Sequence, residues 1–291
     1  MILDYFLSNT VAFTATVFIL GLLVGSFLNV VIYRLPVMMQ AQWQSEIAEF
    51  QEDQQTLEKL KNKQPFNLIK PDSTCPKCGH KIRAWENIPV ISWLFLKGKC
   101  SNCNNPISPR YPAIESITAL LSATIAWYFS PSIATAGLIL FLWCLVALTM
   151  IDVDTQLLPD SITLPLLWLG LLLNLNGIYT GLGSAVIGAV TGYLSLWSVY
   201  WLFKLLTGKE GMGFGDFKLF AAFGAWFGWQ ALPLIILLSS LVGAIVGIAM
   251  ILILGRDKQL PIPFGPYLCG AALIYVFFGK QIVAWYLGVA M

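Results

Sequence analysis

Four cysteines are arranged in two pairs with the spacing of a metal site. Cys75-Pro-Lys-Cys78 and Cys100-Ser-Asn-Cys103 are separated by 21 residues. Each CxxC turn can direct two sulfurs at one ion, and two such turns complete a tetrahedron. Because four thiolates leave no open position for water, we expect a structural Zn²⁺ that folds the surrounding segment. A redox couple or an iron–sulfur cluster is the alternative. His80, the only histidine, is expected beside the site rather than as a ligand.

Two aspartates stand at the ends of apolar segments, where their carboxyl groups could meet. Asp152 follows one such segment and Asp216 precedes another. Two adjacent carboxyl groups do not easily both ionise, so one can take a proton from water while the other donates to a carbonyl oxygen. This is general acid–base hydrolysis of a peptide bond. The alternative is that the charges only fix helix ends, the reading we favour for Asp154 and for Asp160, which suits an N-cap.

Glycines accompany Asp216 and several of the apolar segments. Gly213 and Gly215 could let the backbone turn tightly and let an extended peptide approach the acid. Other glycines recur four residues apart, which permits close helix packing and needs no chemical role. These pairs are Gly188 with Gly192, Gly224 with Gly228, and Gly243 with Gly247.

The residues that must position these groups are mostly apolar. Of the 291 residues, 57% are hydrophobic and 11% charged, and the mean hydropathy is +0.74. Soluble domains are about 25% charged, so the composition excludes a soluble or disordered protein. A net charge of +2 offers no basic field for nucleic acid. Residues 34–112 hold 11 of the 17 Lys and Arg residues, which indicates one polar insert.

We therefore predict an all-α polytopic membrane protein of about eight transmembrane helices, embedded in the lipid bilayer. The expected parts are a first helix within residues 1–33, a zinc-binding cytoplasmic insert over 34–112, and a seven-helix peptidase domain over 113–291. The apolar segments are 11–33, 113–129, 133–151, 161–175, 183–206, 217–229, 231–254 and 265–288. With the insert in the cytoplasm, 16 of the 17 basic residues lie inside and the N-terminus lies outside. Cys144 and Cys269 are expected to be small core residues.

Residues 40–64 are expected to form a polar helix with a narrow apolar stripe. The stripe consists of Trp43, Ile47, Phe50, Leu57 and Leu60. It could lie on the membrane surface, but its polar face carries no basic cluster. A partly packed connecting helix is the favoured interpretation.

Several further motifs occur in a fixed order along nearly the whole chain. They are Gly25-Ser-Phe-Leu-Asn29 continuing to Arg34-Leu-Pro36, Glu86-Asn-Ile-Pro-Val-Ile-Ser-Trp93, Gly98-Lys-Cys100, Arg110-Tyr-Pro112 with Glu115, Asp152-Val-Asp-Thr-Gln-Leu-Leu-Pro-Asp160, Gly213-Phe-Gly-Asp216 and Pro263-Phe-Gly-Pro266. Together with the two CxxC pairs, they resemble the type IV prepilin peptidases, which are bifunctional bacterial leader peptidases and N-methyltransferases. The Gly213–Asp216 element matches the GxGD motif of intramembrane aspartyl proteases.

The resemblance implies an activity and a location. The family cuts the basic leader from type IV prepilins and type II secretion pseudopilins after a glycine, at the cytoplasmic face of the bacterial inner membrane. Asp152 and Asp216 match its catalytic pair. Its second activity methylates the new N-terminal residue with S-adenosyl-L-methionine, and Gly98 matches a glycine associated with that activity. The sequence contains no GxGxxG motif that would indicate methyl-donor binding independently.

Two other classes of function compete with this interpretation. A transporter or channel with a zinc-stabilised cytoplasmic domain would also have many spans, but it normally carries ionisable residues or broken helices at mid-span. These apolar segments carry almost none. A non-catalytic scaffold that binds pilins through its small-residue helix faces is the third possibility.

Overall fold

The chain folds into helices, as the apolar segments predict. The computed structural model describes residues 6, 8–55, 65–255 and 262–287. Within these residues the regular elements are helical, and the only β pairings are two isolated bridges. The chain divides into two compact units, residues 1–135 and 136–291, which are considered separately. The prediction of an all-α protein is confirmed.

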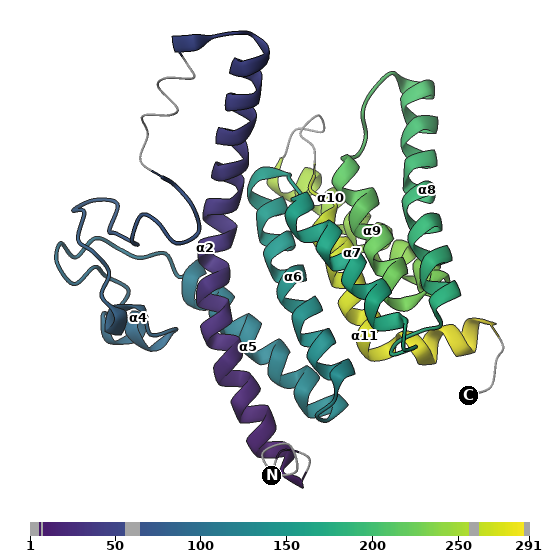
Figure 1. Cartoon of the computed structure of the whole chain (residues 1–291), viewed down its shortest axis with the longest axis horizontal. Helices are drawn as coiled ribbons and strands as arrows, with labels where there is room; N and C mark the ends of the chain where they lie inside the picture. Colours follow the sequence, from purple (N-terminus) through teal and green to yellow (C-terminus); the bar gives the residue numbers. More distant parts are fainter. Residues whose placement is uncertain (1–5, 7, 56–64, 256–261, 288–291) are drawn as a thin grey trace. The chain divides into compact units, whose positions relative to one another are not determined.

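The first unit is built on two long antiparallel helices, α2 (Thr10–Phe50) and α5 (Arg110–Phe129) (Figure 1). Two glycines of α2 allow the close approach. A Cβ added at Gly21 would lie 2.7 Å from the Cα of Ala119, and one at Gly25 would lie 2.7 Å from the Cα of Glu115. Since the partner number falls by four as the glycine number rises by four, the helices run in opposite directions.

Helix α2 is longer than the sequence predicts. The expected first helix ends at Tyr33 and a separate polar helix starts near residue 40, whereas α2 continues through Pro36 to Phe50. Apolar content marks where the predicted span ends, but helix geometry does not require the helix to end there. Trp43, Ile47 and Phe50 of the predicted stripe are exposed, Phe50 by 91%. The expected packing of this stripe is therefore wrong for them, while Leu57 and Leu60 lie outside the described residues.

Short elements of the polar insert are fastened to both long helices. They include the 3-10 helix η1 (Ala84–Asn87) and helix α4 (Ile91–Phe95). The buried guanidinium of Arg34 donates to the carbonyl oxygens of Asn67 at 2.9 Å and Pro71 at 2.7 Å. On α5, the carboxylate of Glu115 accepts a hydrogen bond from the backbone N–H of Val90 at 2.7 Å.

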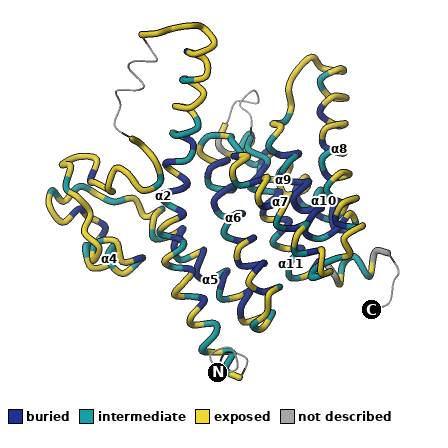
Figure 2. Tube along the Cα trace, in the orientation of Figure 1, coloured by how far each residue is buried: buried dark blue, intermediate teal, exposed yellow. Residues whose placement is uncertain are grey.

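The second unit is a helical bundle around one short helix. Its elements are α6 (Ile133–Thr155), α7 (Asp160–Asn174), α8 (Leu182–Thr207), α9 (Phe214–Phe227), η2 (Trp229–Ala231), α10 (Leu232–Leu254) and α11 (Gly265–Leu287). Almost every residue of α9 from Asp216 to Trp226 is buried (Figure 2). Because other helices enclose α9, its 14 residues need no lipid-facing surface of their own.

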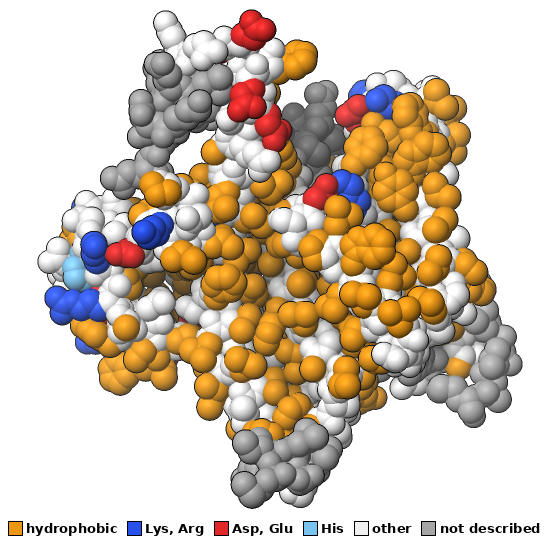
Figure 3. Space-filling model, in the orientation of Figure 1, with side chains coloured by type: hydrophobic (Ala, Val, Ile, Leu, Met, Phe, Trp, Pro, Cys, Tyr) orange, Lys and Arg blue, Asp and Glu red, His pale blue; other side chains and the backbone are white. Residues whose placement is uncertain are grey.

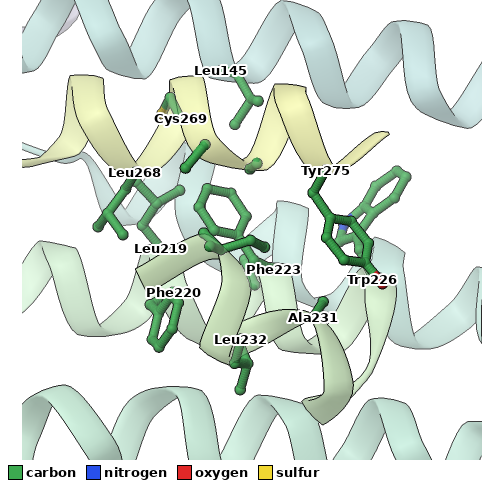
Figure 4. Close-up of a cluster of buried hydrophobic side chains, with 14 of the residues drawn as sticks. Leu145, Leu219, Phe220, Phe223, Trp226, Ala231, Leu232, Leu268, Cys269 and Tyr275 are labelled. Carbon is green, nitrogen blue, oxygen red and sulfur yellow. The ribbon is translucent and has the colours of Figure 1, made fainter. Parts of the chain in front are cut away.

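Aromatic side chains of α9 form the core of the bundle. Phe220, Phe223 and Trp226 belong to one buried cluster with Leu268 and Tyr275 of α11, and the Phe220 ring points away from α11 (Figure 4). Buried Cys269 belongs to the same cluster, and Cys144 packs against it, as expected for small core residues.

The C-terminal end of α9 is closed by a polar side chain. Asn174 of α7 is fully buried and donates to the carbonyl oxygens of Ala225 at 2.8 Å and Trp226 at 2.9 Å. These carbonyls lie at the end of a helix, where backbone partners run out. Trp226 returns a bond from its ring nitrogen to the carbonyl of Leu166 at 2.8 Å. Hydrogen bonds in both directions therefore fix the end of α9 to α7.

The eight apolar segments all coincide with helices of the described chain. Among the residues that the structure describes, four helical stretches are long and apolar enough to cross a membrane: Thr10–Phe50, Ile133–Thr155, Leu182–Thr207 and Trp229–Ile253. Two shorter apolar stretches are Asp160–Asn174 and Gly265–Gly279. Hydrophobic side chains cover much of the visible helical surface (Figure 3). The protein is a membrane protein, and the number of eight spans stays a prediction.

The packing of α8 on α9 predicts that alanine substitutions at two glycines of α8 will change the stability of the protein by different amounts. A Cβ at Gly188 would lie 2.8 Å from the carbonyl carbon of Gly224 in α9, whereas one at Gly183 would meet nothing within 4 Å. We expect Gly188→Ala to lower the free energy of unfolding by about 1–3 kcal/mol, because the helices must move apart. Gly183→Ala is the matched control and should leave it unchanged. Thermal unfolding in detergent measures both, and equal stabilities would contradict the packing.

Candidate active site and metal centre

Asp152 lies in the last turn of α6 and is held by the start of α11. Its carboxylate accepts a hydrogen bond from the backbone N–H of Gly265 at 2.9 Å, and the residue is 5% exposed. Gly265 is the first residue of α11, so its N–H has no partner within that helix. A Cβ at Gly265 would lie 2.7 Å from the Oδ2 atom of Asp152. The acid therefore fits only against a glycine.

Asp216 lies in the first turn of α9, close enough to Asp152 for their charges to interact. The residue is 6% exposed. Its Oδ1 atom is buried and has no hydrogen-bond partner among the described residues. A buried carboxylate oxygen without a partner is costly, and such groups occur where chemistry needs them. The N-terminus of α9 favours a negative charge at this position.

Leu158 packs against the start of α9, which carries Asp216, and the start of α11, which holds Asp152. A Cβ at Gly215 would lie 2.7 Å from the Cβ of Leu158, and one at Gly265 would lie 3.2 Å from its Cδ2. Neither Gly213 nor Gly215 adopts a positive φ, so the expected tight turn through glycine conformations is wrong. Instead Gly215 permits close packing. A Cβ at Gly213 would meet no atom closer than Oδ2 of Asp216 at 3.7 Å, which leaves this side of the acid open to close approach.

The other two aspartates of the region lie away from the pair. Asp154 is exposed. Asp160 is the first residue of α7 and follows Pro159 at the N-cap, so the expected capping role is wrong. Its carboxylate instead accepts from Lys218 of α9 at 2.8 and 2.7 Å. This ion pair holds the starts of α7 and α9 together.

The arrangement of the pair suits proton transfer to and from a substrate. Two buried carboxyl groups with interacting charges hold one proton between them more easily than they lose both. One can then accept a proton from water while the other donates to a carbonyl oxygen. Sequence reasoning placed both aspartates at one face but gave Gly265 no task. The Pro263–Pro266 motif was the available signal, because a proline directly after Gly265 marks a helix start.

The four cysteines of the first unit form one cluster. Their sulfur atoms all lie within 4.8 Å of one another. The Sγ atoms of Cys75 and Cys103 are 3.7 Å apart, and those of Cys78 and Cys100 are 4.0 Å apart. Tetrahedral Zn²⁺ with Zn–S bonds of about 2.3 Å needs sulfurs about 3.8 Å apart. The four thiols therefore fit a tetrahedral metal ion.

The two cysteine turns have the same backbone design. Cys75 N–H donates to the carbonyl of His80, and Cys100 N–H donates to that of Asn105, each at 2.9 Å. The fourth residue after each leading cysteine, Gly79 or Asn104, has a positive φ. Isolated bridges then close both turns, Thr74 with Lys81 and Lys99 with Pro106. Two matching turns can present their sulfurs to one ion from opposite sides.

Hydrogen bonds set the acidity of the thiols. Backbone hydrogen bonding from His80, followed by the Asn102 side chain, lowers the pKa of the Cys78 thiol to about 6. Against a backbone hydrogen bond from Asn105, burial and the neighbouring thiols raise the pKa of Cys103 to about 11. The thiolate is the form that binds a metal. The surroundings of Cys78 therefore favour the metal-binding form, whereas those of Cys103 oppose it.

A polar network outside the sulfur cluster joins the two turns. Glu86 accepts from the backbone N–H of Arg83 at 2.8 Å and from the hydroxyl of Ser101, and its carboxylate lies 3.2 Å from Nε2 of His80. The Arg83 bond, then the Ser101 bond, lowers the pKa of Glu86 to about 2. His80 thus lies beside the sulfurs with a carboxylate partner. The sequence analysis included Glu86 in a motif but gave it no task, because it lies between the cysteine pairs without any metal-ligand spacing.

Gly98 has a structural task next to the second cysteine turn. Its φ is +68°, and a Cβ would lie 2.9 Å from the Trp93 ring. Its N–H donates to the carbonyl of Trp93 at 2.9 Å, and the ring nitrogen of Trp93 donates to the carbonyl of Ile107 at 3.2 Å. Only a glycine satisfies both the backbone conformation and the contact with Trp93.

Comparison with known proteins gives matches in both units. The family model described as the Bacterial Peptidase A24 N-terminal domain matches residues 19–129, and that of the Type IV leader peptidase family matches residues 139–248. No solved structure matches the chain.

Curated relatives match over almost the whole length. A prepilin leader peptidase/N-methyltransferase of Stutzerimonas stutzeri is 56% identical, and one of Pseudomonas aeruginosa is 54% identical, each over 98% of this chain and 97% of the relative. A protein of the same name from Legionella pneumophila is 46% identical over 92% of both chains. By the order of its motifs, its buried acid pair and this identity, the chain belongs to the type IV leader peptidase family.

Proposed function

We propose that Asp152 and Asp216 are the catalytic pair with which this enzyme cuts the leader from type IV prepilins. Family membership gives the protein two activities, prepilin leader cleavage and N-methylation. The observation that supports the catalytic assignment is the burial of both carboxyl groups, one held by Gly265 and the other with an unpartnered oxygen. Neither feature is needed to end a helix.

The proposed reaction uses the pair as acid and base in one step. The ionised carboxylate takes a proton from a water molecule, whose oxygen attacks the carbonyl carbon of the scissile bond. The protonated carboxyl group donates to the carbonyl oxygen, giving a neutral tetrahedral intermediate. When this collapses, the carboxyl group that took the proton from water gives it to the nitrogen, the C–N bond breaks and the amine leaves. The other carboxylate takes the proton of one hydroxyl group, which restores the starting pair with one proton. The Gly265 N–H keeps the carboxylate of Asp152 in position throughout.

We place the pair at the cytoplasmic face of the bacterial inner membrane, with the N-terminus in the periplasm. Asp152 ends α6, while Asp216 and Gly265 begin α9 and α11, so all three belong to one end of the bundle. Basic residues cluster at the same turns in sequence, which is typical of cytoplasmic ends. They are Lys204, Lys209, Lys218, Arg256 and Lys258. A prepilin or type II pseudopilin would present its basic leader there and be cut after a glycine.

The polar insert, which we place at residues 34–112, would hold a structural Zn²⁺ on Cys75, Cys78, Cys100 and Cys103. The sulfur separations support this assignment. Zinc in a closed four-thiolate site supplies folding stability and no reactive position. The seven-helix peptidase domain is then residues 113–291. S-adenosyl-L-methionine is the proposed methyl donor, and Gly98 is linked to that activity by family resemblance and shapes the turn before Cys100.

Loss of either acid should abolish cleavage. We expect Asp152→Asn and Asp216→Asn each to lower the cleavage rate by at least about 10²-fold, because an amide neither accepts nor donates the required proton. Asp154→Asn is the matched control, since this residue is exposed two positions away, and should cleave normally. The mass of a prepilin before and after incubation gives the readout. Normal cleavage by either variant would remove that residue from the mechanism.

The contact between α11 and Asp152 predicts that alanine substitutions at two glycines of α11 will have different effects on cleavage activity. Gly265→Ala should reduce cleavage roughly 10- to 100-fold, because the new Cβ would displace the carboxylate. Gly270→Ala adds a Cβ that meets nothing within 4 Å and should keep full activity. The same prepilin assay applies, with thermal unfolding to confirm that both variants fold. Equal activity of the two would show that the position of Asp152 does not limit the reaction.

Removal of one sulfur should release the metal. Purified protein is expected to contain one zinc ion per chain, and Cys103→Ser to contain none, because three thiolates no longer complete the tetrahedron. Cys144→Ala removes a thiol outside the cluster and should retain zinc. Elemental analysis of the purified proteins measures both. Folded wild-type protein that contains iron or no metal would overturn the zinc assignment.

A further inference from the structure

The start of helix α4 is tied to α5 at a point where α5 packs against the apolar part of α2. The N–H of Val90, just before α4, is bonded to Glu115 at 2.7 Å. Glu115 in turn packs against Gly25, where an added Cβ would lie 2.7 Å from its Cα. Gly25 precedes Arg34, the first charge after the apolar run, by nine residues, or about 14 Å of helix. The start of α4 is therefore level with the apolar run of α2.

The outer face of this short segment is apolar and unprotected. Ile91, Leu94 and Phe95 follow one another at helical spacing and are 48%, 61% and 83% exposed. Trp85 and Ile88, just before α4, are 52% and 43% exposed. Figure 3 shows hydrophobic side chains on the surface of this region. A contiguous apolar surface of this kind marks a binding face.

The stretch of sequence that contains α4 is basic, although the carboxylate of Glu115 on α5 is bonded just before α4. Residues 65–112 carry seven basic and two acidic residues, a net charge of +5. The basic residues are Lys70, Lys77, Lys81, Arg83, Lys97, Lys99 and Arg110, and the acidic ones are Asp72 and Glu86. Lys97 and Lys99 follow α4 directly and are exposed. Apolar residues beside exposed lysines are the pattern of a segment that lies in a membrane interface with anionic lipids.

We propose that α4 is a membrane-interface helix, which inserts Ile91, Leu94 and Phe95 into the leaflet while Lys97 and Lys99 contact anionic phospholipid headgroups. Two observations favour lipid as the binding partner: the level of α4 along the apolar run of α2, and the lysines that follow α4. A soluble partner would have no access to a face level with the apolar run of α2, and an apolar helix from another protein would leave the basic charge unmatched. The zinc-binding segment would thereby be held flat against the membrane.

Two positions with equal exposure allow a matched test. Phe95 and Ile69 are each 83% exposed, but Ile69 lies outside α4. The photoreactive residue p-benzoylphenylalanine would replace either Phe95 or Ile69 in the full chain, reconstituted in nanodiscs and irradiated. We expect lipid adducts, identified by mass, from position 95 and at most a tenth of that yield from position 69. Both variants would first be checked for zinc content, so that an unfolded insert is recognised.

Changing the lipids tests the charge contribution. Nanodiscs with phosphatidylglycerol as about one third of their lipid should give at least about a threefold higher adduct yield at position 95 than nanodiscs of phosphatidylcholine alone. Lys97→Gln with Lys99→Gln should abolish that preference. Adducts mainly to a second copy of the chain or to an added prepilin, or equal lipid adducts at positions 95 and 69, would overturn the proposal.

Discussion

The burial of α9 from Asp216 to Trp226 is the constraint on which the acid pair depends. A carboxyl group can be kept out of water and still precisely placed only if its helix cannot shift, and α9 is fixed along its length. Close packing against Gly188 and Gly192 of α8 fixes its side, and Asn174 closes its C-terminal carbonyls. The position of Asp216 at the other end follows from these contacts. The contacts that stabilise α9 in the bundle are therefore also the contacts that position Asp216.

Asp152 is positioned differently, by a backbone N–H group at the start of α11. The first N–H of α11 has no helical acceptor, and the carboxylate of Asp152 supplies one. Leu158 packs against Gly215 and Gly265, so the turn between α6 and α7 spaces the starts of α9 and α11. The ion pair of Lys218 with Asp160 then joins α7 to α9 on the exposed side. These contacts hold the starts of α7, α9 and α11 together beside the acid pair.

The sequence predicted what depends on composition and spacing, and missed what depends on contact. Apolar runs identify the helices, and the cysteine spacing identifies the cluster, because both signals are local. Nothing local shows that α2 continues through Pro36, since a helix end requires more than a change in polarity. Gly215 illustrates the same limit: its neighbours suggest a turn, but the reason for glycine is Leu158, which is 57 positions away. The motif that begins with Glu86 did not reveal its task, because its partners His80 and Ser101 come from the two separate cysteine turns.

The polar insert has too few buried side chains to fold by hydrophobic packing alone. Among its residues between 65 and 109, only Cys75, Pro89, Gly98 and Cys100 are buried. Its order must come from directed interactions: the Arg34 bonds to two carbonyls, the Glu115 bond to Val90, the Glu86 network and the sulfur cluster. Each of these joins segments that are distant in sequence, as a metal or a disulfide does in other small domains. The apolar side chains that a larger domain would bury remain on the surface, where they are free to contact the lipid of the membrane.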